Sequence, residues 1–203
     1  MPYRAKVAGR TTVKPPRRTS LERGYDRQWR NARAEHLEVH PWCEGCLMRS
    51  LYVRASLVDH IEPHRDDQLL FWDRDNFQSL CASCHSLKSK YESFAVRRDP
   101  VKGRTIVCGP PGSGKTTWLQ SHKEGIDHTF DMDELAGMAF PLPHEIHMRM
   151  LVARGKVLNR MYFTDESAVI IITDERHARR AAASIGADVV RLRDRKNGGG
   201  LPF

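Results

Sequence analysis

Several features are missing from the 203-residue sequence. It has no apolar run of about 18 residues, so we expect no membrane span and no membrane partner. The charges at its N-terminus are not followed by an apolar core, so we expect no signal peptide and a cytoplasmic protein. Acidic residues are fewer than basic ones: the sequence has 25 Asp and Glu and 33 Lys and Arg, for a net charge of +8. Such an excess is typical of proteins that bind a polyanion, most often a nucleic acid.

Cysteine is scarce but patterned. The sequence has five cysteines, which in a cytoplasmic protein argues against disulfides. Cys108 stands alone, and the other four form two Cys-x-x-Cys pairs, Cys43 with Cys46 and Cys81 with Cys84. Each pair makes a turn that aims two thiolates at one point, so the two pairs predict a tetrahedral structural zinc site (Zn²⁺). Binding would stabilise a core that is otherwise too small to hold.

The basic residues concentrate at the N-terminus. Residues 1–35 carry ten Lys and Arg. Residues 1–19 are rich in Pro and Arg without a helical or strand period, and we expect a disordered basic arm that contacts nucleic acid or is simply solvated. Four arginines follow that suit contacts with DNA phosphates: Arg23, Arg27, Arg30 and Arg33. Such contacts carry no information about the base sequence.

The pattern changes along the chain and predicts two domains. Residues 20–94 hold the cysteines, with a helix over 20–39 capped by Ser20, short strands within 51–60 and a helix over 82–93. A linker over 95–103 precedes a second domain over 104–196, and 197–203 form a flexible tail. The second domain alternates strands (105–108, 128–130, 168–173, 187–192) with helices (116–122, 144–162, 176–185). This alternation predicts a small α/β domain with a parallel sheet.

Between and beside the cysteine pairs lie Asp59-His60, Asn76 and His85, in that order. This order resembles the HNH endonuclease family of phages and bacteria, and the upstream run RGYDRQWRNARAEHLEVHPWCEGC resembles the segment that leads into the first cysteines there. The resemblance covers about residues 22–92. It implies an α+β, zinc-stabilised ββα-metal fold and the cleavage of DNA.

The resemblance also implies roles. Phosphodiester hydrolysis needs a base, a cation at the phosphate and stabilisation of the leaving oxygen. By resemblance His60 is the general base, Asp59 and His85 hold a catalytic divalent ion (Mg²⁺ or a transition ion), and Asn76 orients His60 or its loop. The role of His64 stays open. Two lysines lie near His85, Lys88 and Lys90. They either contact DNA phosphates or form a solvated face.

A second motif starts at Gly109. Residues 109–116 match G-x-x-x-x-G-K-[ST], with a predicted strand before and a helix after, which is the context of a phosphate loop. We expect this loop to bind ATP or another nucleoside triphosphate, with Lys115 at the β- and γ-phosphates and the Thr116 hydroxyl on Mg²⁺. The predicted nucleotide-binding residues of the loop are Gly109, Gly112, Ser113, Gly114, Lys115, Thr116 and Thr117.

The acid that completes the Mg²⁺ site has two candidates. Asp131 and Asp133 follow the second strand, as in small P-loop kinases, including polynucleotide kinases, whereas Asp174 and Glu175 follow the third, as in a Walker B strand. The run AVIIITDERHARRAAASIGADVVRL resembles the kinase-like group. Its arginines Arg176, Arg179 and Arg180 either contact phosphate or form a solvated face. A domain of about 100 residues is short for a full nucleotide kinase, and no sensor or arginine finger is evident.

The two motifs together predict a fusion of an HNH nuclease with a kinase-like P-loop domain, in a phage-infected or bacterial cell. The first hypothesis is a metal-dependent DNA endonuclease whose P-loop domain binds nucleotide and regulates or complements cleavage. The second is an end-processing enzyme that also phosphorylates 5′-hydroxyl ends. The third is a DNA-binding adaptor for phage packaging proteins.

Overall fold

A computed structural model describes residue 19 and residues 24–94, 96–132 and 143–193. The predicted arm (apart from Thr19), the Ser20 cap, Arg23, Asp133 and the C-terminal tail lie outside these residues. No helix in the described ranges is both long and apolar enough to span a membrane.

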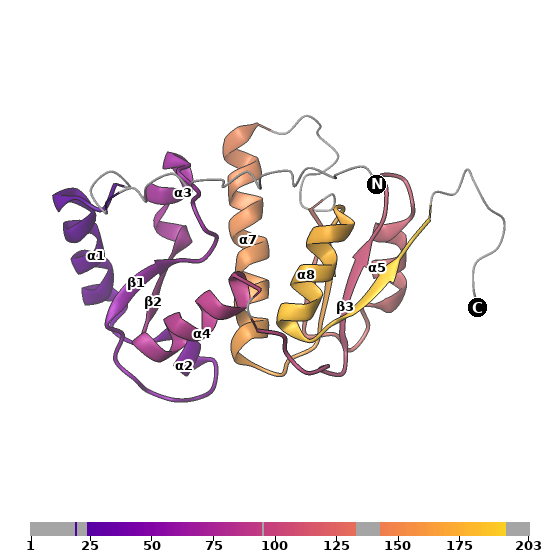
Figure 1. The fold of residues 1–203 in the computed structure, drawn as a ribbon, viewed down its shortest axis with the longest axis horizontal. Helices are drawn as coiled ribbons and strands as arrows, with labels where there is room; N and C mark the ends of the chain where they lie inside the picture. The colour runs from indigo at the N-terminus through magenta and orange to yellow at the C-terminus, as the bar shows by residue number, and fades with distance from the viewer. Residues whose placement is uncertain (1–18, 20–23, 95, 133–142, 194–203) are drawn as a thin grey trace, which may run out of the picture.

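The N-terminal part is a β-hairpin between helices (Figure 1). Strands β1 (Leu57–His60) and β2 (Phe77–Leu80) pair antiparallel, with His60 opposite Phe77. Helix α4 (Ala82–Glu92) follows directly, which gives the predicted ββα order. The elements around this unit are α1 (Arg27–Val39), α2 (Glu44–Leu47), α3 (Gln68–Trp72) and the 3-10 helix η2 (Arg74–Asn76).

The prediction for the first helix was wrong at its start. Helix α1 begins at Arg27, because the Asp26 side chain caps it by accepting the backbone N–H of Trp29 at 3.0 Å. Gly24, with φ of 89°, lies in the left-handed region just before this cap, where a helix cannot continue. The predicted strand over 51–60 is also shorter, since only Leu57–His60 forms β1.

The C-terminal part confirms the predicted parallel sheet. Strands β3 (Arg104–Cys108), β4 (His128–Phe130), β5 (Ala168–Ile171) and β6 (Asp188–Arg191) are all parallel, in the order β4-β5-β3-β6. The intervening helices are α5 (Lys115–His122), α7 (His144–Phe163) and α8 (Glu175–Ile185). Because the strands are parallel, the loop after β3, Asp131 after β4 and Asp174 after β5 gather at one edge of the sheet.

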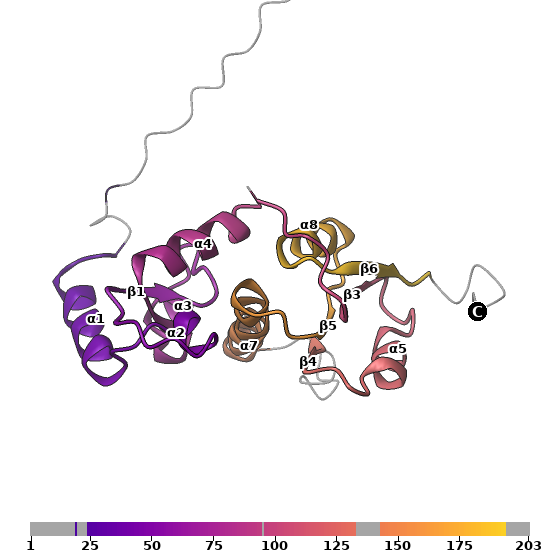
Figure 2. The same ribbon diagram turned by 90° about the horizontal axis from the view of Figure 1, so that it is seen from below.

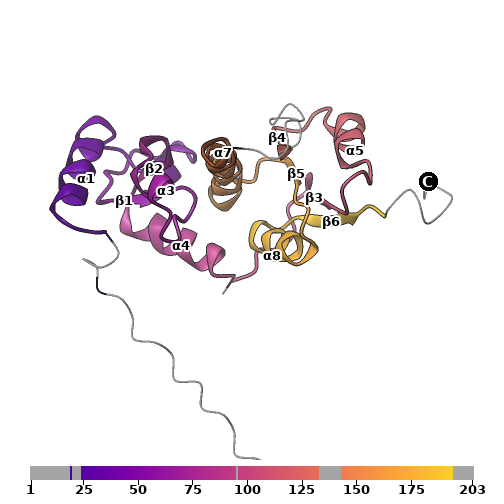
Figure 3. The same cartoon turned by 90° about the horizontal axis from the view of Figure 1, so that it is seen from above.

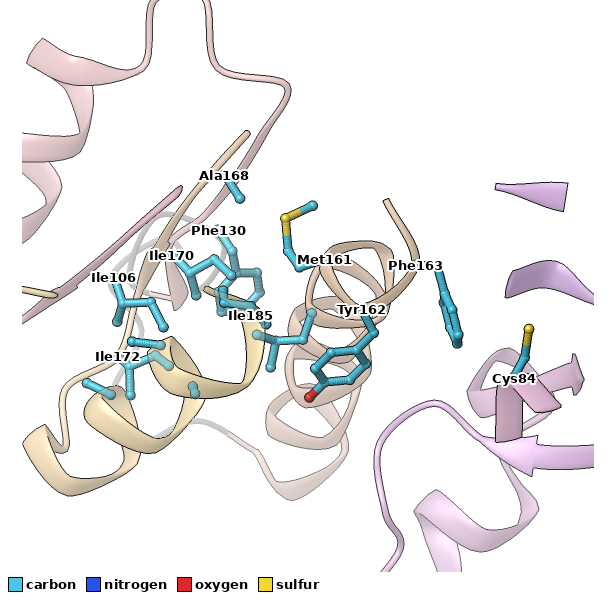
Figure 4. Close-up of a cluster of buried hydrophobic side chains, with 14 of the residues drawn as sticks. Cys84, Ile106, Phe130, Met161, Tyr162, Phe163, Ala168, Ile170, Ile172 and Ile185 are labelled. Atoms are coloured by element: carbon cyan, nitrogen blue, oxygen red, sulfur yellow. The ribbon is translucent and has the colours of Figure 1, made fainter. Parts of the chain in front are cut away.

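Helix α7 lies between the two parts and packs on both, as Figures 2 and 3 show from opposite sides. One buried cluster contains three of the paired cysteines together with Ile106, Ile170 and Phe163. Figure 4 shows Phe163 on the side of α7 that faces Cys84, while Met161 lies toward the sheet. Tyr162 of α7 also stacks on Tyr91 of α4, at 5.3 Å between ring centroids. The two parts therefore share a core.

A buried arginine lies at the amino-terminal edge of the parallel sheet. Arg104 is 1% exposed, and its guanidinium donates to the carbonyls of Met161, Thr164, Glu166 and Ile185, at 2.6–3.0 Å. These carbonyls lie at and beyond the C-terminal ends of α7 and α8, where helices leave acceptors unpaired. Burial lowers the pKa of Arg104 to about 10, so it stays charged at neutral pH.

Candidate active site and zinc centre

The four paired cysteines converge. Their sulfur atoms all lie within 4.8 Å of one another, and this is the one group of three or more potential metal ligands among the described residues. The Sγ of Cys46 lies 3.9 Å from that of Cys81 and 3.6 Å from that of Cys84. Four sulfurs at about 2.3 Å from a tetrahedral zinc lie about 3.8 Å apart, so the cluster has the geometry of a Zn²⁺ site. None of the four cysteines forms a disulfide in the described part of the chain.

Arg49 lies beside the sulfur cluster. Its Nη2 donates to the Sγ of Cys84 at 3.1 Å, and the guanidinium stands 6.0 Å from the ring centroid of Phe163. A positive charge here offsets part of the negative charge of four thiolates around one zinc. The sequence motif gave no sign of this contact.

Asp59 and His85 come together across the hairpin and α4. Asp59 is the penultimate residue of β1, directly before His60, and His85 lies in the first turn of α4, directly after Cys84. The Nε2 of His85 lies 3.9 Å from the Oδ1 of Asp59. Two atoms that each bind one divalent ion at about 2.1 Å can be at most about 4.2 Å apart, so this pair fits a shared ion. The side chains are 43% and 22% exposed, which leaves room for water and phosphate.

The second oxygen of Asp59 is held by buried donors. The Nζ of Lys88 lies 2.9 Å from Oδ2, and the Nε2 of Gln78 donates to it at 3.2 Å. Lys88 is 1% exposed and also donates to the carbonyl of His60 and to Glu92. The expectation that Lys88 meets DNA phosphates or forms a solvated face was therefore wrong: it turns inward to the carboxylates of Asp59 and Glu92. Lys90 is exposed.

His60 is fixed in one tautomer by its surroundings. It is 5% exposed, its ring stacks on Trp29 of α1 at 5.1 Å, and its Nε2 lies 3.0 Å from the carbonyl oxygen of Phe71. A carbonyl only accepts, so Nε2 carries the proton and Nδ1 is the basic nitrogen. Burial lowers the pKa of His60, so the ring is neutral at neutral pH. His64 packs 4.9 Å from this ring and accepts the backbone N–H of Asp66.

Asn76 ties the loop after His60 in place. It is fully buried, its Oδ1 accepts the N–H of Glu62 at 2.8 Å, and its Nδ2 donates to the carbonyls of Glu62 and Leu70. All the capacity of the amide except one acceptor site is used within the protein. The geometry suits a residue that orients the loop rather than one that meets substrate.

The glycine motif forms a loop at the carboxyl edge of the parallel sheet. Gly112 and Gly114 have φ of 76° and 89°, and a Cβ at Gly109 would lie 2.5 Å from the carbonyl oxygen of Leu192. The Nζ of Lys115 donates to two loop carbonyls, those of Gly109 and Pro110. The Oγ of Ser113 is buried and has no hydrogen-bond partner in the described part of the chain.

The two candidate acids for Mg²⁺ differ in position. The Oγ1 of Thr116 donates to Oδ2 of Asp131 at 2.6 Å, so these two side chains meet. Asp174 instead caps α8 by accepting the N–H of His177 at 2.6 Å. The geometry favours Asp131 over Asp174. Thr117 is exposed on the outer side of the helix start, and Asp133 lies beyond the described residues.

The predicted phosphate-contacting arginines are scattered. Arg27 and Arg30 are exposed on α1, whereas Arg33 donates to the carbonyl of Ser56. On α8, Arg179 pairs with Glu175 at 2.8 Å, while Arg176 and Arg180 face a cleft toward the N-terminal part. Trp29, Gln78 and Lys88 shape the site around Asp59 and His60, yet nothing in the spacing of the motif identified them.

Comparison with known proteins agrees with the N-terminal site. The family model described as HNH endonuclease matches residues 43–90. The crystal structure of an HNH endonuclease from the deep-sea thermophilic bacteriophage GVE2, with manganese ion, is 34% identical in sequence. The match covers 36% of this chain and 83% of that one, with a TM-score of 0.34. No curated protein matches the chain.

Residues 43–90 include both cysteine pairs, Asp59-His60, Asn76 and His85, which are the residues that carried the resemblance. The predicted nuclease is thereby confirmed as a phosphodiester hydrolase. Residues 43–90 therefore form an HNH endonuclease domain, and this part of the chain belongs to that family.

Proposed function

We propose that this protein cleaves DNA with a divalent ion held by Asp59 and His85 and with His60 as the general base. The observation that supports this most directly is the 3.9 Å separation of His85 Nε2 and Asp59 Oδ1. Because Lys88 and Gln78 occupy Oδ2 of Asp59, its Oδ1 is the oxygen turned toward His85. Two protein ligands leave most positions of a divalent ion open for water and phosphate.

The protein's own groups account for water activation. With its proton fixed on Nε2 by the Phe71 carbonyl, His60 presents Nδ1 as the proton acceptor. Burial keeps the ring neutral, so it is ready to accept a proton at pH 7. A bound divalent ion would neutralise charge at the scissile phosphate. The Trp29 stack and the Asn76 clamp hold the ring and its loop in this arrangement.

Nicking of supercoiled plasmid tests this assignment. His60→Ala should lower the cleavage rate by about 10²- to 10⁴-fold, the usual contribution of a general base, while DNA binding stays. His122→Ala, an exposed histidine on the distant helix α5, is the matched control and should cleave at the wild-type rate. Removal of divalent ions should stop cleavage, and Mn²⁺ or Mg²⁺ should restore it. If His60→Ala cleaves as fast as His122→Ala, His60 is not the base.

We also propose that the second part of the chain binds a nucleoside triphosphate with Mg²⁺ at residues 109–116. Support comes from the glycine conformations, the unpartnered Ser113 hydroxyl and the meeting of Thr116 with Asp131. A buried hydroxyl without a partner fits a group that bonds to an absent phosphate. Lys115→Ala should abolish binding of a fluorescent ATP analogue, and Lys123→Ala, past the end of α5, should not. If both variants bind ATP equally, the loop is not the site.

The meeting of Asp131 with Thr116 also favours a kinase activity as the second candidate function, because an acid after the second strand resembles polynucleotide kinases. Transfer of labelled γ-phosphate to a 5′-hydroxyl oligonucleotide measures it directly, and Lys115→Ala should abolish the transfer. If Lys115→Ala changes neither cleavage nor its dependence on nucleotide, the nucleotide does not regulate the nuclease. A packaging adaptor remains the outcome if DNA is bound but neither reaction occurs.

A further inference from the structure

A cavity lies where the two parts of the chain meet. Its volume is about 420 Å³, and it is walled by the loop after β1, the end of α4, helix α7 and the start of α8. Such a volume is in the range of sites for small molecules, so it accommodates a few groups of a single strand rather than a duplex. The first residue of its lining is Ile61, which directly follows His60 in the chain.

The lining of the cavity carries more arginines than acids, four against three. Each acid has a partner: Glu62 pairs with Arg154 in the wall at 3.3 Å, Glu92 pairs with Lys88, and Asp174 caps α8. No carboxylate within the described ranges pairs with the three exposed arginines of the lining, Arg65, Arg176 and Arg180. These arginines come from both parts of the chain, Arg65 from the nuclease and the other two from α8.

Two further observations point to a ligand. The Nε of Arg154 is buried in the wall without a hydrogen-bond partner among the described residues. Phe94 lines the cavity with 41% of its surface exposed, beside Arg180, whose guanidinium lies 5.9 Å from the ring centroid. Arginines that bind phosphate, next to an exposed aromatic ring, are the usual means of holding a single nucleic-acid strand.

The cavity also leads toward the nucleotide loop. A second cavity, at the carboxyl ends of β4 and β5, is lined by Asp131, and the two cavities share Arg154, Asp174 and His177. The pKa of His177 is lowered, mainly by burial and next by the nearby charges of Arg154 and Arg65. These two arginines therefore lie near the wall that the two cavities share. The lining therefore runs from the nuclease loop to the residue that contacts Thr116.

We propose that this cleft binds the sugar-phosphate backbone of a single nucleic-acid strand and guides it between the nuclease site and the nucleotide loop. The proposal rests on the proposed function in that both sites act on the same nucleic acid. Arg65, Arg176 and Arg180 contact the phosphates, and Phe94 stacks on a base. A free mononucleotide shares this chemistry, so the test separates a strand from a nucleotide.

The test measures binding of a fluorescein-labelled single-stranded 12-mer to the zinc-loaded full chain by anisotropy, over a range of salt and without added divalent ions. Arg176→Gln with Arg180→Gln should weaken binding about tenfold. With the loss of two phosphate contacts, the slope of log K against log salt should fall by about 1.4, or about 0.7 per contact. The control is Arg179→Gln on the same helix, which removes one positive charge outside the cavity and should change affinity less than twofold.

Arg65→Gln and Phe94→Ala, from the other wall, should weaken binding in the same direction. Equal effects of the Arg179 and Arg176/Arg180 variants, or no effect of either, would overturn the proposal. So would dAMP that displaces the 12-mer at equal phosphate concentration, since this would indicate a mononucleotide site. The binding assay does not depend on catalysis. If the wild type does not nick plasmid, the nuclease proposal is contradicted, but the anisotropy measurement still tests whether the cavity binds a single strand.

Discussion

Phe163 offers a direct test of the shared core. It is the last residue of α7, is 5% exposed, and its ring lies against Gly45 and Cys84 of the zinc centre. A Cβ on Gly45 would lie 3.0 Å from two ring atoms, so the ring fills the space beside the sulfur cluster. Phe163→Ala should therefore weaken the contact between the nuclease and the second part of the chain.

The expected magnitude follows from burial. Truncating a buried phenylalanine to alanine costs about 3–5 kcal/mol in the free energy of unfolding, because the lost contacts are joined by a cavity. For a chain of this size each kcal/mol lowers Tm by about 2–4 °C, so Tm should fall by about 6–20 °C. Zinc should also dissociate faster, since the ring covers the cluster on the side of α7.

Thermal unfolding followed by circular dichroism gives the first value, and transfer of zinc to a coloured chelator gives the second. Ile146→Ala on the same helix is the control: its side chain is 45% exposed, and its loss should change stability by less than about 0.5 kcal/mol. Equal losses in the two variants, or a loss below about 1 kcal/mol for Phe163→Ala, would show that the two parts do not share a core.

Three further predictions concern the sites. Lys88→Met should lower metal-dependent nicking about 10- to 100-fold, because Asp59 loses the cation that orients it. The nicking rate is measured against Mn²⁺ concentration, and identical curves for wild type and variant would contradict this. Trp29→Leu removes the stack on His60 and should lower kcat about tenfold with KM unchanged, so a change in KM alone would count against it. Cys84→Ala should leave less than one zinc per chain and unfold the nuclease part, as elemental analysis and circular dichroism would show; full zinc content would refute the four-sulfur site.

Local sequence patterns predicted most elements well. Strand β4 and the end of α8 at Gly186, with φ of 67°, lie where the pattern put them, because hydrophobic period and glycine act within a few residues. The predicted start of α1 was wrong for a local reason too. Ser20 and Asp26 can both cap a helix, and the apolar spacing that begins at Leu21 does not show which of them does so. The strand over 51–60 was overestimated because apolar residues there, such as Tyr52, are exposed rather than paired.

The amino-acid order alone determined the four zinc-binding cysteines, the catalytic candidates Asp59, His60 and His85, and the parallel sheet, because each depends on residue type at short spacing. Tertiary structure decided what surrounds them: Lys88 buried against Asp59, Trp29 stacked on His60, and α7 joining the two parts into one core. Contacts between residues distant in the chain depend on how helices pack, and a single sequence does not encode that packing in any local pattern.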